Sequence, residues 1–133
     1  MQHNNAHGVL EKTIVILEKI LELDGEEISA DTYIVRDLGA ESIDLLEVAV
    51  GLNQEFGIKV QDDHVFLWRL RYYLVEARKS GVDVHSYLAG KYPFLDSARI
   101  AEILIDLDKG PVLKVRDIIS YINFQLSGVM AGK

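Results

Sequence analysis

The 133-residue chain is long enough for one domain with a hydrophobic core and too short for two ordinary ones. Its composition, 49 % hydrophobic and 26 % charged, excludes a disordered chain. Residues 1–64 hold 4 basic and 14 acidic residues, a net charge of −10, whereas residues 65–133 hold 10 basic and 7 acidic residues, a net charge of +3. Because acidic surfaces repel phosphates, we expect no nucleic-acid partner and instead partners that present Lys and Arg.

Several kinds of site and segment are missing from the sequence. It contains no cysteine, which excludes disulfides, thiolate metal sites and a cysteine nucleophile. His64 and His85 stand in no metal-ligand spacing, so we expect no metal site. The opening residues MQHNNAHG lack the pattern of a signal peptide, and no apolar run approaches the ~20 residues of a membrane span. We therefore expect a cytoplasmic protein without a membrane span.

The hydrophobic pattern of the first half predicts two helices joined by a long loop. Apolar residues recur every three or four positions over residues 9–23, and Asp24-Gly25 marks the end of that helix. Residues 24–41 form the loop, which is ordered only if its apolar anchors dock. The second helix runs from residue 41 or 42 to residue 56, with Gly57 as its stop. The expected loop anchors are Ile28, Tyr33, Ile34 and Leu38, and the expected buried stripe is Leu45, Val48, Ala49, Leu52 and Phe56.

The second half is predicted to be helical as well, which makes the fold class all-α. Residues 65–79 are ambiguous between helix and buried strand, but their length and basic end favour a helix. Residues 83–90 predict a short helical turn. Residues 97–108 predict an amphipathic helix with Ser97 or Asp96 as its cap, and residues 114–126 predict the last helix.

The stretch DLGAES, residues 37–42, places the Ser42 hydroxyl at the start of the acidic second helix. A helix N-terminus has free backbone N–H groups and the positive end of the macrodipole, so it suits a phosphate on Ser42. No histidine lies nearby in sequence and there is no Gly-x-Ser-x-Gly elbow, so nothing local activates Ser42 as a catalytic nucleophile. Alternatively, Ser42 is only a helix cap, although Leu45 at the capping-box position excludes the reciprocal form.

Two blocks of the sequence resemble the acyl carrier protein family. Residues 26–58 resemble its first loop and second helix, and residues 115–122 resemble its closing V-x-D-x-I-x-Y-I pattern. The resemblance implies an up-down helical bundle with a long first loop, and a carrier instead of an enzyme. It implies that a phosphopantetheinyl transferase, with a divalent metal ion, moves 4′-phosphopantetheine from coenzyme A to Ser42. The thiol of this covalent arm would hold acyl groups as thioesters.

The resemblance also implies an acidic face that partner enzymes read through basic docking surfaces. These partners are the transferase and enzymes that load, transfer or condense acyl groups. An ordinary solvated helix face is the alternative. Glu41 stands where the family usually has Asp, and Ile43 where it usually has Leu or Met, which leaves open the transferase and partners that accept the chain. The expected recognition residues are Asp37, Glu41, Ile43, Asp44, Glu47 and Glu55.

Residues 62–109 exceed the short segment that usually separates the second and last helices of the family. If 97–108 is the equivalent of the usual third helix, about 62–96 is a helical insertion in a single domain, 1–133. The insertion is either extra core or a lid or groove wall for a bulky acyl chain or a dedicated partner. Its basic residues Arg69, Arg71, Arg78 and Lys79 are also available to pair with the acidic helix.

We therefore expect a monomeric carrier for fatty-acid, lipid or polyketide-type biosynthesis. An aminoacyl or peptidyl carrier is one alternative, and an unmodified interaction module of the same fold is another. A hydrolase that uses Ser42 has no plausible base in the sequence.

Overall fold

A computed structural model of the chain describes residues 5–131. Over this range the chain is all-α, which confirms the expected fold class, and its only β-type pairing is an isolated bridge between Tyr33 and Lys114. None of the described helices is both long enough and apolar enough to cross a membrane. The helices are α1 (Asn5–Leu21), α2 (Ser42–Phe56), α3 (Asp62–Val65), α4 (Leu70–Ser80), α5 (Val84–Lys91), α6 (Ser97–Asp106), the 3₁₀ turn η2 (Leu107–Lys109) and α7 (Val115–Ala131).

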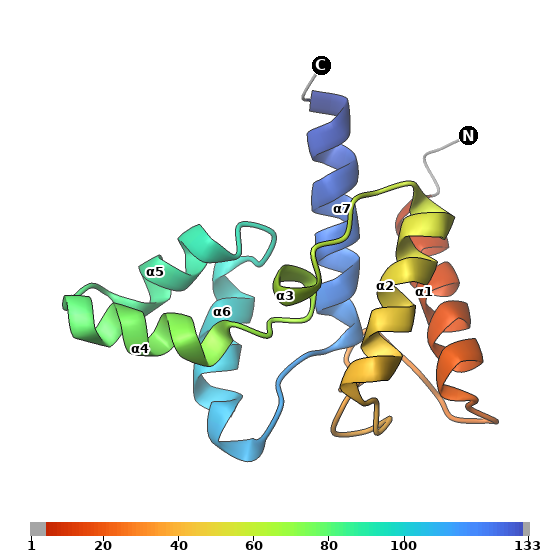
Figure 1. Cartoon of the computed structure of the whole chain (residues 1–133), viewed down its shortest axis with the longest axis horizontal. Coiled ribbons are helices and arrows are strands. Elements are labelled where there is room, and N and C mark those ends of the chain that lie inside the picture. The colour runs from red at the N-terminus through yellow and green to blue at the C-terminus, as the bar shows by residue number, and fades with distance from the viewer. Residues whose placement is uncertain (1–4, 132–133) are drawn as a thin grey trace.

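The helices form two groups on either side of α7. Figure 1 shows α1 and α2 side by side at one side of the molecule, with α7 in the middle and α4, α5 and α6 beyond it. Helix α1 contacts both α2 and α7, and the short α3 packs on α7. The sequence predicted extra helices between the second and last long helices, and α3, α4 and α5 are those helices.

One continuous hydrophobic cluster runs through both groups. Leu17 of α1, Leu52 of α2 and Ile122 of α7 are each fully buried in it. Leu74 and Leu88 bring α4 and α5 into the same cluster. At about 25 cal/mol per Å² of buried apolar area, such side chains stabilise the extra helices as part of the same core. The bundle and the inserted helices therefore share their main source of stability.

Glycines end two of the helices, and one of them, Gly57, stands where the sequence predicted a stop. Gly57 follows α2 with a φ of 65°, and Gly81 follows α4 with a φ of 70°, both in the left-handed region that glycine adopts without a Cβ clash. Asp96, and not Ser97, caps α6, because its carboxylate accepts a hydrogen bond from the Arg99 N–H at 2.8 Å.

The single helix predicted over residues 65–79 is wrong. The structure divides this segment into the end of α3, a turn at residues 66–69, and α4. Leu67 has a φ of 59° inside the turn, and its side chain is buried. A left-handed leucine costs roughly 1–2 kcal/mol, so tertiary packing must stabilise a break that local propensity opposes.

Candidate functional site

The loop before α2 is held in place by its backbone and by apolar anchors. Ile34 is fully buried, and its N–H donates to the carbonyl of Leu113, just before α7, at 3.0 Å. The Ala40 N–H donates back to the Ile34 carbonyl at 3.2 Å. Tyr33, Ile28 and Leu38 are half-buried, so the expected anchors dock. The end of the loop, and with it the start of α2, is therefore fixed against the core.

Asp37 has a structural role in this loop. Its carboxylate accepts a hydrogen bond from the Tyr33 N–H at 2.9 Å, and its own N–H donates to the Tyr33 carbonyl at 3.0 Å. Gly39 follows with a φ of 72°, a left-handed conformation that a larger residue adopts only with strain. The carboxylate that was expected to face partners thus closes the turn three residues before Ala40.

Ser42 is the first residue of α2, and Glu41 occupies the N-cap. The Asp44 carboxylate accepts a hydrogen bond from the Glu41 N–H at 2.8 Å, which forms the reciprocal contact of a capping box. The idea that Ser42 is the cap is therefore wrong. The expectation that Ser42 and Leu45 form no capping box is confirmed, because the box is built from Glu41 and Asp44.

The Ser42 side chain is left accessible by this arrangement. It is exposed, and its hydroxyl makes no hydrogen bond with any part of the chain that the structure describes. The first intrahelical bond of α2 runs from Leu45 to Glu41, so the N–H groups of residues 42–44 precede the hydrogen-bonded ladder. A phosphate ester on the hydroxyl would meet the positive end of the helix. The site fits a serine that another enzyme modifies.

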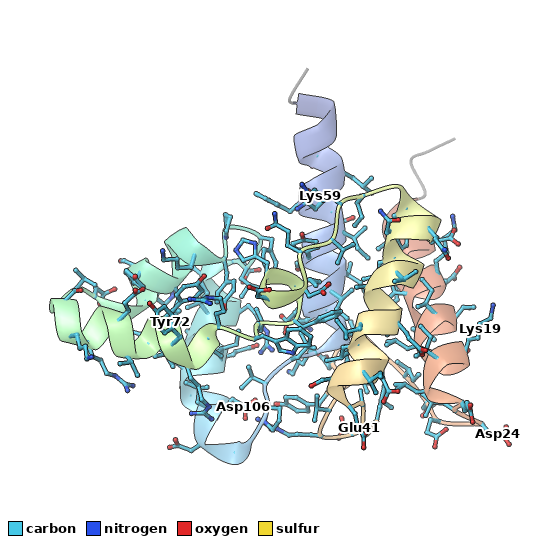
Figure 2. The ribbon with its side chains drawn as sticks, in the orientation of Figure 1. Lys19, Asp24, Glu41, Lys59, Tyr72 and Asp106 are labelled. Carbon is cyan, nitrogen blue, oxygen red and sulfur yellow. The ribbon has the colours of Figure 1, made fainter. Side chains whose placement is uncertain are left out.

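A pocket of about 510 Å³ opens directly beside Ser42. Figure 2 shows Glu41 at the end of α2 where the loop arrives, and Asp106 near the end of α6 on the same side of the molecule. The loop, α2, the 66–69 turn, the start of α4 and the segment after α6 all contribute walls. The lining residues are Val35, Ala40, Glu41, Ser42, Leu45, Phe66, Leu67, Trp68, Leu70, Arg71, Leu107, Gly110, Pro111 and Leu113.

The basic residues of α4 do not pair with α2. The Arg69 guanidinium lies 4.5 Å from the centre of the Tyr72 ring, and Arg71 donates to the Leu107 carbonyl at 3.3 Å. Over residues 5–131, no ion pair joins α4 to α2. The acidic charge of α2 is therefore not neutralised by the insertion.

The exposed face of α2 carries both charge and apolar surface. Glu41 and Glu47 are exposed, and Ile43 is 65 % exposed. Leu46 and Val50 are also exposed, although they are not among the recognition residues expected from the sequence. They lie three and seven residues after Ile43, so a 3.6-residue period places all three on one side of the helix. The sequence carried a signal for this apolar row, because its helical spacing can be read beside the predicted buried stripe.

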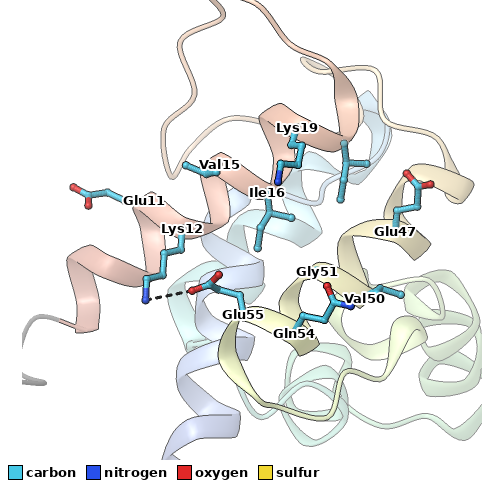
Figure 3. Close-up of a pocket in the computed structure, with 11 residues that line it drawn as sticks. Glu11, Lys12, Val15, Ile16, Lys19, Glu47, Val50, Gly51, Gln54 and Glu55 are labelled. Carbon is cyan, nitrogen blue, oxygen red and sulfur yellow. Dashed lines mark ion pairs between the residues drawn. The ribbon is translucent and has the colours of Figure 1, made fainter.

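Glu55 lies at the far end of α2 and pairs with α1. Its carboxylate is 3.4 Å from the Lys12 ammonium, across a groove of about 870 Å³ between the two helices (Figure 3). The helices approach closely beneath this groove, because a Cβ on Gly51 would lie 3.1 Å from the Ile16 side chain. Among the expected recognition residues, Glu55 is thus partly neutralised within the chain.

Comparisons with known proteins agree with this geometry. The family described as phosphopantetheine attachment site matches residues 11–68. The acyl carrier protein of Nitratidesulfovibrio vulgaris (strain Miyazaki F) is 40 % identical over 56 residues, which cover 42 % of this chain and 74 % of that protein. The chain belongs to the acyl carrier protein family. The acyl carrier protein of Solidesulfovibrio magneticus is 38 % identical over 56 residues, 42 % of this chain and 72 % of that protein.

Membership in the acyl carrier protein family confirms several expectations. The chain is a carrier and not an enzyme, and its cofactor is covalently attached 4′-phosphopantetheine. The phosphopantetheinyl transferase and acyl-handling enzymes are its partners as a class. No solved structure matches the chain significantly. The family match ends at residue 68, inside the turn before α4, so α4 and α5 lie outside it.

Proposed function

We propose that Ser42 is the attachment point of 4′-phosphopantetheine and that the chain carries acyl intermediates for fatty-acid, lipid or polyketide-type biosynthesis. The observation that carries this proposal is the exposed Ser42 hydroxyl, free of hydrogen bonds to the described residues, on the first turn of α2. Glu41 and Asp44 form the helix cap, so the Ser42 hydroxyl is not used in capping. The thiol of the attached arm supplies the thioester chemistry.

The modification requires only access to Ser42 and an external catalyst. The Ser42 Oγ attacks the phosphorus that bears pantetheine in coenzyme A, and a new P–O ester bond forms. The P–O–P bond of coenzyme A breaks, and adenosine 3′,5′-bisphosphate leaves with the electron pair. The hydroxyl proton passes to a base of the transferase. An exposed serine with no activating partner among the described residues suits a reaction in which the transferase supplies the base.

We propose that residues 1–133 act as one domain, with about 62–96 as an insertion. The shared hydrophobic cluster supports this, because Leu74 and Leu88 belong to the same core as Leu52. We also propose that the carrier acts as a monomer, and in the cytoplasm, where coenzyme A and a transferase would meet it.

The deciding experiment is intact-protein mass spectrometry after incubation with coenzyme A and a phosphopantetheinyl transferase. The wild type should gain one phosphopantetheine, and Ser42→Ala should gain none. Ser97→Ala is the matched control, because Ser97 is also an exposed first residue of a helix behind an acidic N-cap. It should be modified like the wild type. A wild type that gains no mass with several transferases would sink the proposal.

A further inference from the structure

The pocket beside Ser42 has one wall formed by the last residues of the matched family region and by the start of α4, just beyond it. The 66–69 turn and the first residues of α4 supply Phe66, Leu67, Trp68 and Arg71 to it. Ser42 itself lines the same pocket, so any group attached to its hydroxyl begins at the pocket mouth. The volume of about 510 Å³ lies in the range of roughly 300–1,000 Å³ that is typical of small-molecule sites.

Trp68 is placed at this wall by an unfavourable backbone conformation. Leu67 turns the chain with a φ of 59°, and Trp68 follows it with its ring 5.5 Å from that of Phe66. The Trp68 side chain remains 44 % exposed, although tryptophan is one of the large aromatic residues that usually bury most of their surface. A ligand that covers this half-exposed aromatic side chain removes apolar surface from water, which favours binding.

Arg71 gives this wall its charge. Among the described residues that line the pocket, Arg71 is the only cation and Glu41 the only acid. Its hydrogen bond to the Leu107 carbonyl, at 3.3 Å, ties the guanidinium to another residue that lines the pocket. That bond uses one N–H of a group that has five, so donors remain for a phosphate.

We propose that Arg71 and Trp68 hold the arm on Ser42 inside this pocket: the Arg71 guanidinium pairs with the phosphodiester, and Trp68 covers the pantetheine chain. The inference rests on the proposed attachment at Ser42. It follows from charge complementarity, since the phosphodiester carries one negative charge and Arg71 is the one cation within the lining. The inserted segment then binds the arm while no partner is present, and the arm leaves the pocket to reach a partner.

Trp68 provides a direct readout, because it is the only tryptophan in the chain. Acrylamide quenching of its fluorescence is measured for the apo protein, the phosphopantetheinylated protein and Ser42→Ala treated identically. We expect modification to lower the quenching constant by about half, because a side chain that is 44 % exposed becomes covered. The Ser42→Ala value should stay at that of the apo protein.

Arg71→Gln tests the charged half of the proposal. The modified variant should gain the same mass as the wild type but lose most of the Trp68 protection. Its ³¹P NMR shift should move toward that of the unfolded modified protein. In the modified wild type, added salt should weaken the protection in the same direction. Arg78→Gln is the matched control, since Arg78 lies two turns further along α4, is exposed and does not line the pocket.

The outcomes separate the two proposals. If mass spectrometry shows no phosphopantetheine on wild type, the attachment at Ser42 fails. If the mass gain occurs but Trp68 quenching is unchanged, or if Arg71→Gln and Arg78→Gln behave alike, the arm does not use this pocket. Protection of Trp68 that rises with protein concentration in the apo form would assign the wall to a second copy and also overturn the inference. Circular dichroism of each variant confirms that it is folded.

Discussion

The Tyr33 hydroxyl donates a hydrogen bond to the Asp106 carboxylate at 2.6 Å, which ties the loop before α2 to the end of α6. Arg36 reaches the same carboxylate at 3.1 Å and donates from its Nε to the Pro111 carbonyl at 2.8 Å. These contacts join two walls of the pocket beside Ser42, since the loop contributes one and the segment after α6 another. Their loss would loosen the surroundings of the serine without touching it.

This contact predicts a pH dependence of stability. The hydrogen bond from Tyr33 lowers the pKa of Asp106 below its usual 3.8, and the same bond raises the pKa of Tyr33 above 10.0. A lowered carboxyl pKa stabilises the fold above pH 3.8 and loses that effect as pH falls through the folded value. A raised phenol pKa stabilises the fold below pH 10.0 and loses that effect as pH rises through the folded value.

We expect Tyr33→Phe to lower the free energy of unfolding by about 1 kcal/mol near neutral pH. Below pH ~4 and above pH ~10 the difference from the wild type should shrink. Urea unfolding across this range measures both effects. Asp106→Asn should also weaken the fall in the free energy of unfolding at acidic pH. Asp108→Asn, at an exposed position two residues further on, should not. If Asp106→Asn leaves the acid dependence of the unfolding free energy unchanged, the contact does not contribute to it.

A second prediction concerns the buried pair of Arg99 and Asp117. The Arg99 Nε and Nη2 lie 2.7 and 2.8 Å from the two carboxylate oxygens, and the residues are 5 % and 0 % exposed. Asp117 also accepts from the Lys114 N–H at 2.9 Å, at the start of α7. Arg99→Met leaves Asp117 buried without its counter-charge, and Asp117→Leu leaves Arg99 with only the exposed Glu102, at 3.3 Å, so either substitution should cost about 3–5 kcal/mol.

The double variant distinguishes the pair from simple packing. Arg99→Met with Asp117→Leu should be less destabilised than the sum of the single variants, because no unpaired charge remains. Arg116→Met is the control, since Arg116 is exposed and, within residues 5–131, pairs only with the exposed Asp31, so it should cost less than about 1 kcal/mol. Additive single and double variants would mean that the pair has no coupling.

The sequence predicted elements wherever the signal was local. The range of α2 followed from its apolar period and from Gly57, and both are local features. It missed the turn at Leu67, because a left-handed leucine contradicts every local propensity and depends on packing. It also missed that Trp68 and Arg71 lie beside Ser42, since that proximity depends on contacts between segments far apart in the chain. The role of Glu41 as the cap was hidden because serine is the commoner cap.

A third prediction follows from the shared core. Phe94, before α6, packs edge-on against Tyr121 of α7 with ring centres 5.1 Å apart. If the inserted helices and the bundle are one unit, unfolding followed by Trp68 fluorescence and by far-UV circular dichroism should coincide. Phe94→Ala should shift both transitions together by about 3 kcal/mol. Phe124→Ala, at a position 43 % exposed, should shift them far less. Two separate transitions would contradict a single domain.

The last prediction distinguishes two carboxylates of α2. Glu47 is exposed between the exposed side chains of Leu46 and Val50, and within residues 5–131 it forms no ion pair. Glu55 is paired with Lys12 at 3.4 Å, so part of its charge is already neutralised. Glu47→Gln should therefore lower the kcat/KM of modification by a transferase about threefold to tenfold, and Glu55→Gln by less.

The comparison is controlled because both substitutions remove one negative charge from the same helix and keep a similar side-chain shape. The difference between them should shrink as salt is added, since screening weakens attraction between exposed charges. Steady-state kinetics of modification at low and high salt measure it. Equal effects of the two substitutions would show that the transferase reads the net charge of the acidic half and not a defined face of α2. A larger effect of Glu55→Gln would place the docking surface nearer the C-terminal end of α2.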